Sequence, residues 1–214
     1  MTFGVPELLA LYAKGQFPMA ENQTSYSVAI IDPEMRGILP LSALHLPRRL
    51  ARTINSERFH VTINNNFAAV IAMCAEPAVD RQQTWINPGI DYLCQELHQL
   101  GHAHSVECYL DNKLVGGLYG VTLGGAFFGE SMFTRSRDAS KVALFHLCAR
   151  LIKQGFCLLD TQFITEHLEQ FGAIEITRDD YLQLLQTAKQ QSPTFCSANK
   201  TMSGQQVLQI LKNK

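Results

Sequence analysis

One carboxylate, Glu130, stands in the most glycine-rich stretch of the chain, the nineteen residues from Val115 to Phe133. The stretch reads as two strands joined by a turn, and it contains six glycines. Glycine weakens a strand unless a ligand or another backbone must come close, so this density predicts a binding surface. A carboxylate among apolar neighbours needs a partner, because burying an unpaired charge is costly. Glu130 is therefore predicted to bind a cation, or else to form a structural ion pair with Arg135 or Lys141.

A second polar pair, Asp160 and Gln162, follows the apolar run Phe156–Leu159, which is typical of a short buried strand. Residues i and i+2 of an extended segment point to the same side, so both side chains are expected to reach one site. The structural alternative is that Asp160 and Gln162 cap the helix expected at Thr165–Phe171.

Histidine and cysteine offer two further kinds of chemistry, and the spacing supports neither. His98, His102 and His104 are close in sequence, but a glycine ends the helix between the first two, and no acidic or cysteine ligand follows at metal-site spacing. Cys157 with His167 would make a nucleophile pair, but Cys157 is expected inside an apolar strand, where a thiol stays protonated and inert. We therefore predict no metal site and no cysteine nucleophile.

Basic residues cluster between positions 36 and 58, although the net charge of the chain is only −1. Only one acid, Glu57, opposes five arginines there, and two histidines add to the cluster. The cluster indicates either a surface that contacts phosphates or a solvated helix face. The residues concerned are Arg36, Arg48, Arg49, Arg52, Arg58, His45 and His60.

Length and composition describe an ordinary globular chain. Its 214 residues, 46% hydrophobic and 17% charged, can form one large domain or one domain with a small companion. No apolar run approaches a membrane span, and no signal peptide is expected. The cysteines lack metal or redox spacing and favour a reducing cytoplasm; they are Cys74, Cys94, Cys108, Cys148, Cys157 and Cys196.

The elements that must position these residues follow from periodicity, caps and turn signals. An antiparallel meander is expected over residues 104–133, followed by a long helix that Asp138 or Ser140 caps. The other expected strands are 27–31, 37–40, 59–64, 156–159 and 173–177, and the other expected helices are 6–14, 47–54, 67–75, 88–100, 165–171 and 178–189. This order predicts an α+β acyltransferase-like domain with an antiparallel or mixed sheet flanked by helices.

Several short motifs occur in one order along the chain. They are TWI (84–86), HAHSVE (102–107), GGLYGV (116–121), GESMF (129–133), DASK (138–141) and DTQ (160–162). In this order and spacing they resemble the bacterial leucyl/phenylalanyl-tRNA–protein transferases, from about Pro6 to Tyr181. The resemblance implies a GNAT-like catalytic domain over residues 37–190, a small N-terminal α/β domain over 1–36, and a partly helical tail over 191–214.

The resemblance also implies an activity and its partners. Such an enzyme would move Leu, also Phe and less readily Met, from aminoacyl-tRNA to the N-terminal α-amino group of proteins beginning with Lys or Arg. The transfer would mark those proteins for N-degron degradation in the cytoplasm. The protein would act as a monomer with no metal or cofactor beyond the charged tRNA. The rival interpretations are a non-catalytic tRNA- or peptide-binding module and a transferase with another acceptor preference.

The roles of individual residues likewise come from the resemblance. Asp160 and Gln162 would be the catalytic pair, or would only position a substrate-assisted reaction, and Glu130 would hold the acceptor's amino terminus or the aminoacyl ammonium. Arg48, Arg49 and Arg52 would contact the tRNA acceptor stem. Trp85 would contact the terminal adenosine or line the entrance of an apolar cup for the donor side chain. The expected wall of that cup is Leu118, Phe127, Met132, Leu144, Leu147 and Leu159, each of which would also suit an ordinary core.

Two positions depart from the family pattern. Met19 stands where longer members carry Trp, so stacking by an aromatic ring is lost while adaptable apolar contact remains. Residues 28–31, VAII, replace aromatics before the Asp-Pro step. The segment 135–140 also lacks the glycines with which acetyl-CoA-dependent relatives of the fold bind pyrophosphate, which argues against coenzyme A as donor.

Overall fold

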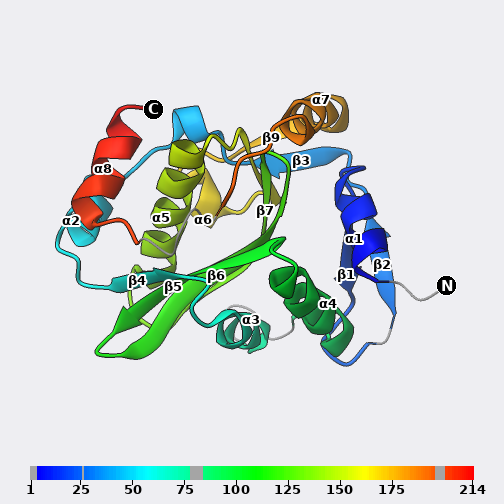
Figure 1. The fold of residues 1–214 in the computed structure, drawn as a ribbon, viewed down its shortest axis with the longest axis horizontal. Coiled ribbons are helices and arrows are strands. Elements are labelled where there is room, and N and C mark those ends of the chain that lie inside the picture. Colours follow the sequence, from blue (N-terminus) through cyan, green and yellow to red (C-terminus); the bar gives the residue numbers. More distant parts are fainter. Residues whose placement is uncertain (1–3, 26, 78–83, 196–200) are drawn as a thin grey trace.

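The computed structural model describes residues 4–25, 27–77, 84–195 and 201–214. Its centre is a seven-stranded mixed sheet in the order β4-β5-β6-β7-β8-β3-β9 (Figure 1). Neighbouring strands pair antiparallel except β7 and β8, which run parallel. The strands are β3 (Met35–Ile38), β4 (His60–Ile63), β5 (Ala103–Leu110), β6 (Lys113–Leu123), β7 (Ala126–Thr134), β8 (Leu158–Gln162) and β9 (Ile174–Thr177).

The expected meander is confirmed as β5, β6 and β7. Its first turn has Asp111 and Asn112 at φ 50° and 60°, the left-handed conformation that a tight hairpin turn requires. The glycines of β6 prove to serve close packing rather than a ligand. A Cβ on Gly116 would lie 2.5 Å from the Cβ of Ala139, and one on Gly120 would lie 2.3 Å from the carbonyl oxygen of Phe128.

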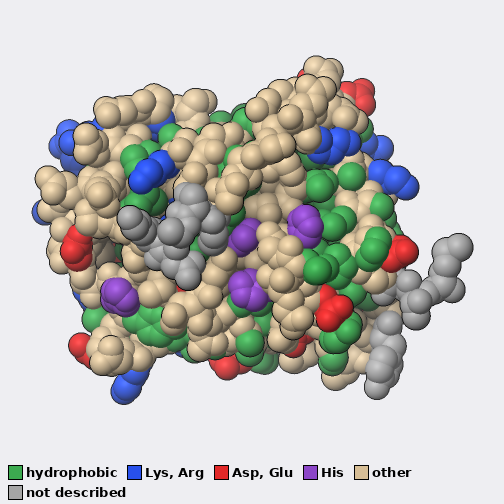
Figure 2. All heavy atoms as spheres, in the orientation of Figure 1, with side chains coloured by type: hydrophobic (Ala, Val, Ile, Leu, Met, Phe, Trp, Pro, Cys, Tyr) green, Lys and Arg blue, Asp and Glu red, His purple; other side chains and the backbone are tan. Residues whose placement is uncertain are grey.

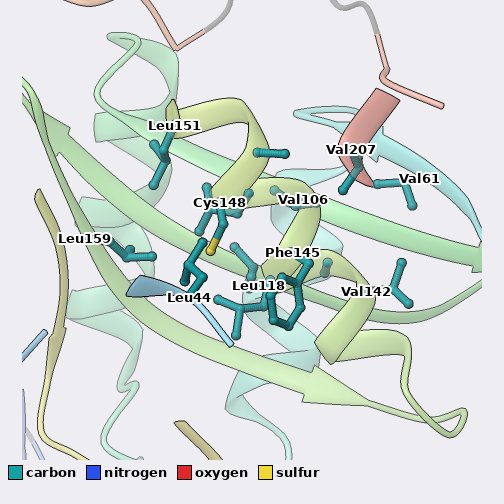
Figure 3. Packing of buried hydrophobic residues seen from close by; sticks show 14 of the residues in the cluster. Leu44, Val61, Val106, Leu118, Val142, Phe145, Cys148, Leu151, Leu159 and Val207 are labelled. Atoms are coloured by element: carbon teal, nitrogen blue, oxygen red, sulfur yellow. The ribbon is translucent and has the colours of Figure 1, made fainter. Parts of the chain in front are cut away.

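Helices cover both faces of the sheet (Figure 1). On one face α5 (Ala139–Gln154) packs on β5, β6 and β7, and α2 (Arg48–Asn55) and α8 (Gly204–Lys212) pack against α5. Figure 3 shows Phe145, Cys148 and Leu151 of α5 among Val106 and Leu118 of the sheet. On the other face lie α3 (Phe67–Ala75) and α4 (Pro88–Gln99), while α7 (Arg178–Lys189) contacts β3, β7, β8 and β9.

The N-terminal segment lies beside α4 (Figure 1), and its buried side chains share one hydrophobic cluster with residues of the main sheet. It consists of α1 (Val5–Tyr12) and a two-stranded antiparallel sheet, β1 (Phe17–Ala20) with β2 (Val28–Ile31). The sequence predicted β2 but not β1, which contains a proline. The domain boundary expected between residues 36 and 37 falls inside β3. This strand pairs with both β8 and β9 of the main sheet.

Three local expectations differ from the structure. The helix expected at 165–171 is only α6 (Glu166–Glu169). Asp138 is the N-cap residue of α5 but forms no side-chain cap bond, because its carboxylate binds Arg49 instead. Cys157 is exposed and precedes β8, so the prediction that it lies inside an apolar strand is wrong. Within the described residues, no helix is both long and apolar enough to cross a bilayer.

Candidate active site

A cavity of about 300 Å³ opens where β6, β7 and β8 meet α5 and α6. It unites eight of the predicted site residues: Trp85, Leu118, Glu130, Met132, Leu144, Leu147, Leu159 and Gln162. The remaining wall was not predicted, and half of it comes from the strands and half from the turn after β8 and from α6: Tyr119, Gly129, Ser131, Thr161, Phe163, Thr165, His167 and Leu168. The site is thus an apolar cup with a polar edge.

Glu130 supplies the negative charge of this cavity. Its Oε1 accepts hydrogen bonds from the hydroxyl of Tyr12 at 2.9 Å and from Nε2 of Gln162 at 2.9 Å. Its Oε2 has no hydrogen-bond partner among the described residues, so one carboxylate oxygen remains for a ligand. The ion pairs of Glu130 with Arg135 or Lys141, expected as alternatives, are not formed. Arg135 binds Glu76, and Lys141 binds no carboxylate in the described part of the chain.

The surroundings of Glu130 disfavour its charge when the cavity holds no cation. Its pKa is raised from 4.5 to about 7, first by burial and also by the nearby charge of Asp160. The hydrogen bonds from Tyr12 and Gln162 and the charge of Arg36 oppose this rise only in part. A bound cation would favour the ionised form and lower the pKa again, so this carboxylate is suited to an ammonium or guanidinium ligand.

Asp160 lies beneath the site and is fully buried, so it does not line the cavity. Nε and Nη2 of Arg36 donate to its two oxygens at 2.9 and 2.7 Å. The hydroxyl of Tyr181 donates to it at 2.6 Å, and the backbone N–H of Gln162 donates at 2.7 Å. Four donors occupy its acceptor positions. In this arrangement the carboxylate can hold other groups in place, but it does not face a substrate.

The backbone conformation of Gln162 explains why the side chains of Asp160 and Gln162 point in different directions. Gln162 has a φ of 63°, a left-handed conformation that is costly for a residue with a side chain. The bond from its amide to Asp160 holds that conformation, and its side chain turns to Glu130. The expected same-side pattern of i and i+2 therefore fails here, because the segment is no longer extended at its last residue.

Two predicted substrate-binding residues, Phe127 of the cup and Met19 outside it, do not line the cavity. Phe127 is fully buried in the core, where its ring stacks on that of Phe195. Met19 is half-buried on β1 and does not line the cavity. Both positions were inferred from the family pattern, and sequence alone offers no signal of which core residues border a cavity.

The predicted basic residues divide into two groups. Arg48, Arg49 and Arg52 are exposed on α2. Arg49 makes a bidentate pair with Asp138 at 2.8 and 3.0 Å, yet half of its side chain stays exposed. Arg36 was wrongly counted as part of this surface: it is 1% exposed, and the rings of Phe17 and Tyr181 flank its guanidinium.

The histidines are held by structural contacts. Nδ1 of His98 lies 2.8 Å from the carbonyl oxygen of Ala103, and its ring stacks on Phe67. His104 is buried and stacks on Phe195. No group of three or more His, Cys, Asp or Glu that could hold a metal occurs in the part of the chain that the structure describes.

A larger cavity, about 740 Å³, lies between β2 and α4, and none of the described residues that line it is charged. Figure 2 shows hydrophobic side chains gathered on this side of the molecule. The carboxylate, amide and histidine that could take part in chemistry lie in the smaller cavity instead. That cavity can hold an apolar side chain beside a cation.

The chain is similar to known proteins of one family. The model of the family described as leucyl/phenylalanyl-tRNA protein transferase matches residues 38–186. A transferase of that name from Maricaulis maris is 52% identical over 209 residues, covering 98% of this chain and 97% of the relative. Those from Phenylobacterium zucineum and Zymomonas mobilis are 57% and 58% identical, covering 87% and 85% of this chain and 84% and 68% of the relatives.

Among solved structures, that of L-PGS from Bacillus licheniformis is 15% identical, covers 76% of this chain and 55% of that chain, and superposes with a TM-score of 0.39. A likeness of this size supports no conclusion about fold or function.

Proposed function

The chain belongs to the leucyl/phenylalanyl-tRNA protein transferase family and is an aminoacyltransferase; we propose that it moves leucine from aminoacyl-tRNA to the N-terminal α-amino group of proteins that begin with Lys or Arg. Phenylalanine is a second donor residue and methionine a poorer one. The observation that carries the acceptor assignment is Glu130, a carboxylate with one unbonded oxygen at the edge of an apolar cup.

The acceptor's positive charge is what Glu130 would recognise. A guanidinium or ammonium can donate to Oε2, and charge-assisted bonds of this kind are strong when water is partly excluded. Tyr12 and Gln162 fix the other oxygen and so hold the carboxylate in one orientation. An acceptor that begins with Asp would bring a second negative charge to this edge and would bind poorly.

The cup provides selection of the donor side chain. Its apolar wall includes Leu118, Met132, Leu144, Leu147 and Leu159, none of which offers a hydrogen bond. Unbranched Cβ positions, as in Leu, Phe and Met, enter such a cup, while Val and Ile are disfavoured by shape. Discrimination by shape alone is modest, roughly 1–3 kcal/mol per methylene.

The reaction is aminolysis of the ester that joins the amino acid to the terminal ribose. The neutral acceptor amine attacks the carbonyl carbon, a C–N bond forms, the C–O bond to the 3′ oxygen breaks, and that oxygen receives the proton the nitrogen releases. The side-chain oxygen of Gln162 would accept a hydrogen bond from the attacking amine, since its NH₂ group already binds Glu130. Asp160 accepts a hydrogen bond from the backbone N–H of Gln162, so it would position Gln162 rather than act as a base.

The remaining features of the proposal concern partners and organisation. Arg48, Arg49 and Arg52 would contact phosphates of the tRNA acceptor stem. Each contact would make the fall of log affinity with log salt concentration steeper by roughly 0.7–0.9. The protein would work as a cytoplasmic monomer of the N-degron route, with the charged tRNA as donor and no further cofactor. Residues 37–190 would form a GNAT-like catalytic domain, preceded by a small domain over 1–36 and followed by a tail over 191–214.

The test is transfer of labelled leucine from Leu-tRNA to two short peptides that differ only in starting with Arg or Asp. We expect transfer to the Arg peptide, and loss of it in Glu130→Ala, whose kcat/KM should recover little in Glu130→Gln because the amide carries no charge. Val-tRNA is the control donor and should react poorly. Transfer only to the Asp peptide would overturn the acceptor assignment, and tRNA binding without transfer to either would indicate a binding module.

A further inference from the structure

Lys141 is a basic residue of α5 to which the proposed reaction has given no role. It is in the first turn of α5, three residues after Asp138, which binds Arg49 of α2. Its Nζ lies 5.9 Å from the centre of the Phe171 ring. Lys141 is partly exposed and forms no ion pair with any described carboxylate, including those of Glu166 and Glu169 on α6.

His167 approaches the same aromatic ring from the cavity side. Its ring stands edge-on to that of Phe171, with centroids 5.3 Å apart and an angle of 87° between the planes. Among the described residues that line the cavity, His167 is the only basic one. Burial lowers its pKa from 6.5, and Lys141 lowers it further, so near neutral pH the imidazole carries one N–H donor and no charge.

These contacts run from α2 through the first turn of α5 to His167 of α6, which lines the cup. Arg49 reaches Asp138 at the start of α5, Lys141 follows on the same helix, and Phe171 joins Lys141 to His167. Basic groups thus continue from the exposed helix to the cavity wall. Glu130, at the polar edge, would repel an anion, so an anionic ligand needs a cation away from that edge.

We propose that Lys141 and His167 bind the phosphate on the 5′ side of the terminal nucleoside of the donor, the phosphate nearest to the reacting ester. This inference rests on the proposed function, because it assigns one part of the aminoacyl-tRNA to a place beside the cup. Lys141 supplies the charge and His167 a directed N–H bond. The contact fixes the terminal ribose, so that its 3′ ester enters the cavity from the α6 side.

The experiment uses two inhibitors of transfer from Leu-tRNA to the Arg peptide: 3′-leucylamino-3′-deoxyadenosine and the same compound with a 5′-phosphate. Their amide bond prevents transfer, so each gives an inhibition constant. In the unaltered protein the phosphate should tighten inhibition roughly five- to tenfold, the value of about one charged hydrogen bond reduced by exposure to water. In Lys141→Ala the ratio should fall to about two or less, and His167→Leu should lower it as well.

Two controls make the ratio specific. Lys141→Arg keeps the charge and should keep most of the phosphate effect. Lys153→Ala removes an exposed cation from the other end of α5 and should leave the ratio unchanged. A phosphate that gives no gain in the unaltered protein, or a gain that survives in Lys141→Ala, overturns this inference alone. Absence of transfer from Leu-tRNA in the unaltered protein would instead overturn the proposed function.

Discussion

Replacement of Glu130 by Gln should stabilise the protein at alkaline pH while abolishing transfer. Gln can keep an oxygen acceptor for Tyr12 and Gln162 but removes the charge that burial disfavours. In the folded protein the pKa of Glu130 is about 7, against 4.5 for an ordinary glutamate. The folded state therefore holds a proton on this group between pH 4.5 and 7 that the unfolded state has lost, and the free energy of unfolding declines across that range.

The magnitude follows from the two pKa values. A rise from 4.5 to about 7 corresponds to about 3 kcal/mol at most, and relaxation around a half-buried carboxylate reduces this to roughly 1–3 kcal/mol. We expect the variant to gain that amount relative to the unaltered protein between pH 5 and pH 8. For a chain of this length the gain corresponds to roughly 2–4 °C in Tm per kcal/mol.

The assay is urea unfolding of both proteins at pH 5 and pH 8, with Glu107→Gln as the matched control. Glu107 is another buried glutamate of the sheet, but it accepts bonds from Thr62, Ser105 and the amides of Asn65 and Asn66. Its replacement should destabilise the protein at both pH values. If Glu130→Gln has the same effect on stability at pH 5 and pH 8, ionisation of Glu130 does not lower the free energy of unfolding.

The same pKa makes acceptor use depend on pH. Transfer to an Arg peptide needs ionised Glu130 and a neutral α-amine, so log kcat/KM should steepen below about pH 7. Tyr12→Phe removes a bond that lowers the pKa of Glu130, and should move this bend to higher pH. A profile that keeps its bend at the same pH in Tyr12→Phe would contradict the assigned role of this hydroxyl.

Two further predictions concern the supports of the site. Gly37→Ala places a Cβ 2.7 Å from the backbone carbon of Phe163, and should lower kcat/KM roughly tenfold or more by displacing that turn, whereas Gly89→Ala, whose nearest neighbour is 3.5 Å away, should keep activity. Arg36→Met leaves Asp160 buried without its cation and should cost roughly 3–5 kcal/mol in urea unfolding, much of which the double variant with Asp160→Asn should recover. Retained activity in the first variant, or no recovery in the second, would contradict the proposed supports.

Local sequence was sufficient for much of the framework. Periodicity and turn chemistry predicted the meander of β5, β6 and β7, the long helix after it and a strand at 156–159, which the structure places two residues later as β8. These elements are decided by neighbouring residues, since alternation of apolar side chains and left-handed turn positions are local properties. β1 and the short α6 were missed or misjudged, because packing rather than local preference decides them.

The candidate site itself depended on contacts that are distant in sequence. Tyr12 reaches Glu130 across 118 positions, and Arg36 reaches Asp160 across 124. No local pattern distinguishes Arg36, which is buried, from the exposed arginines of α2, or shows that Asp160 faces inward while Gln162 faces the cavity. The sequence by itself determined which polar groups are available and which strands carry them. Only the tertiary structure decided which groups meet, because the energy of a buried charge depends on partners that chain folding brings to it.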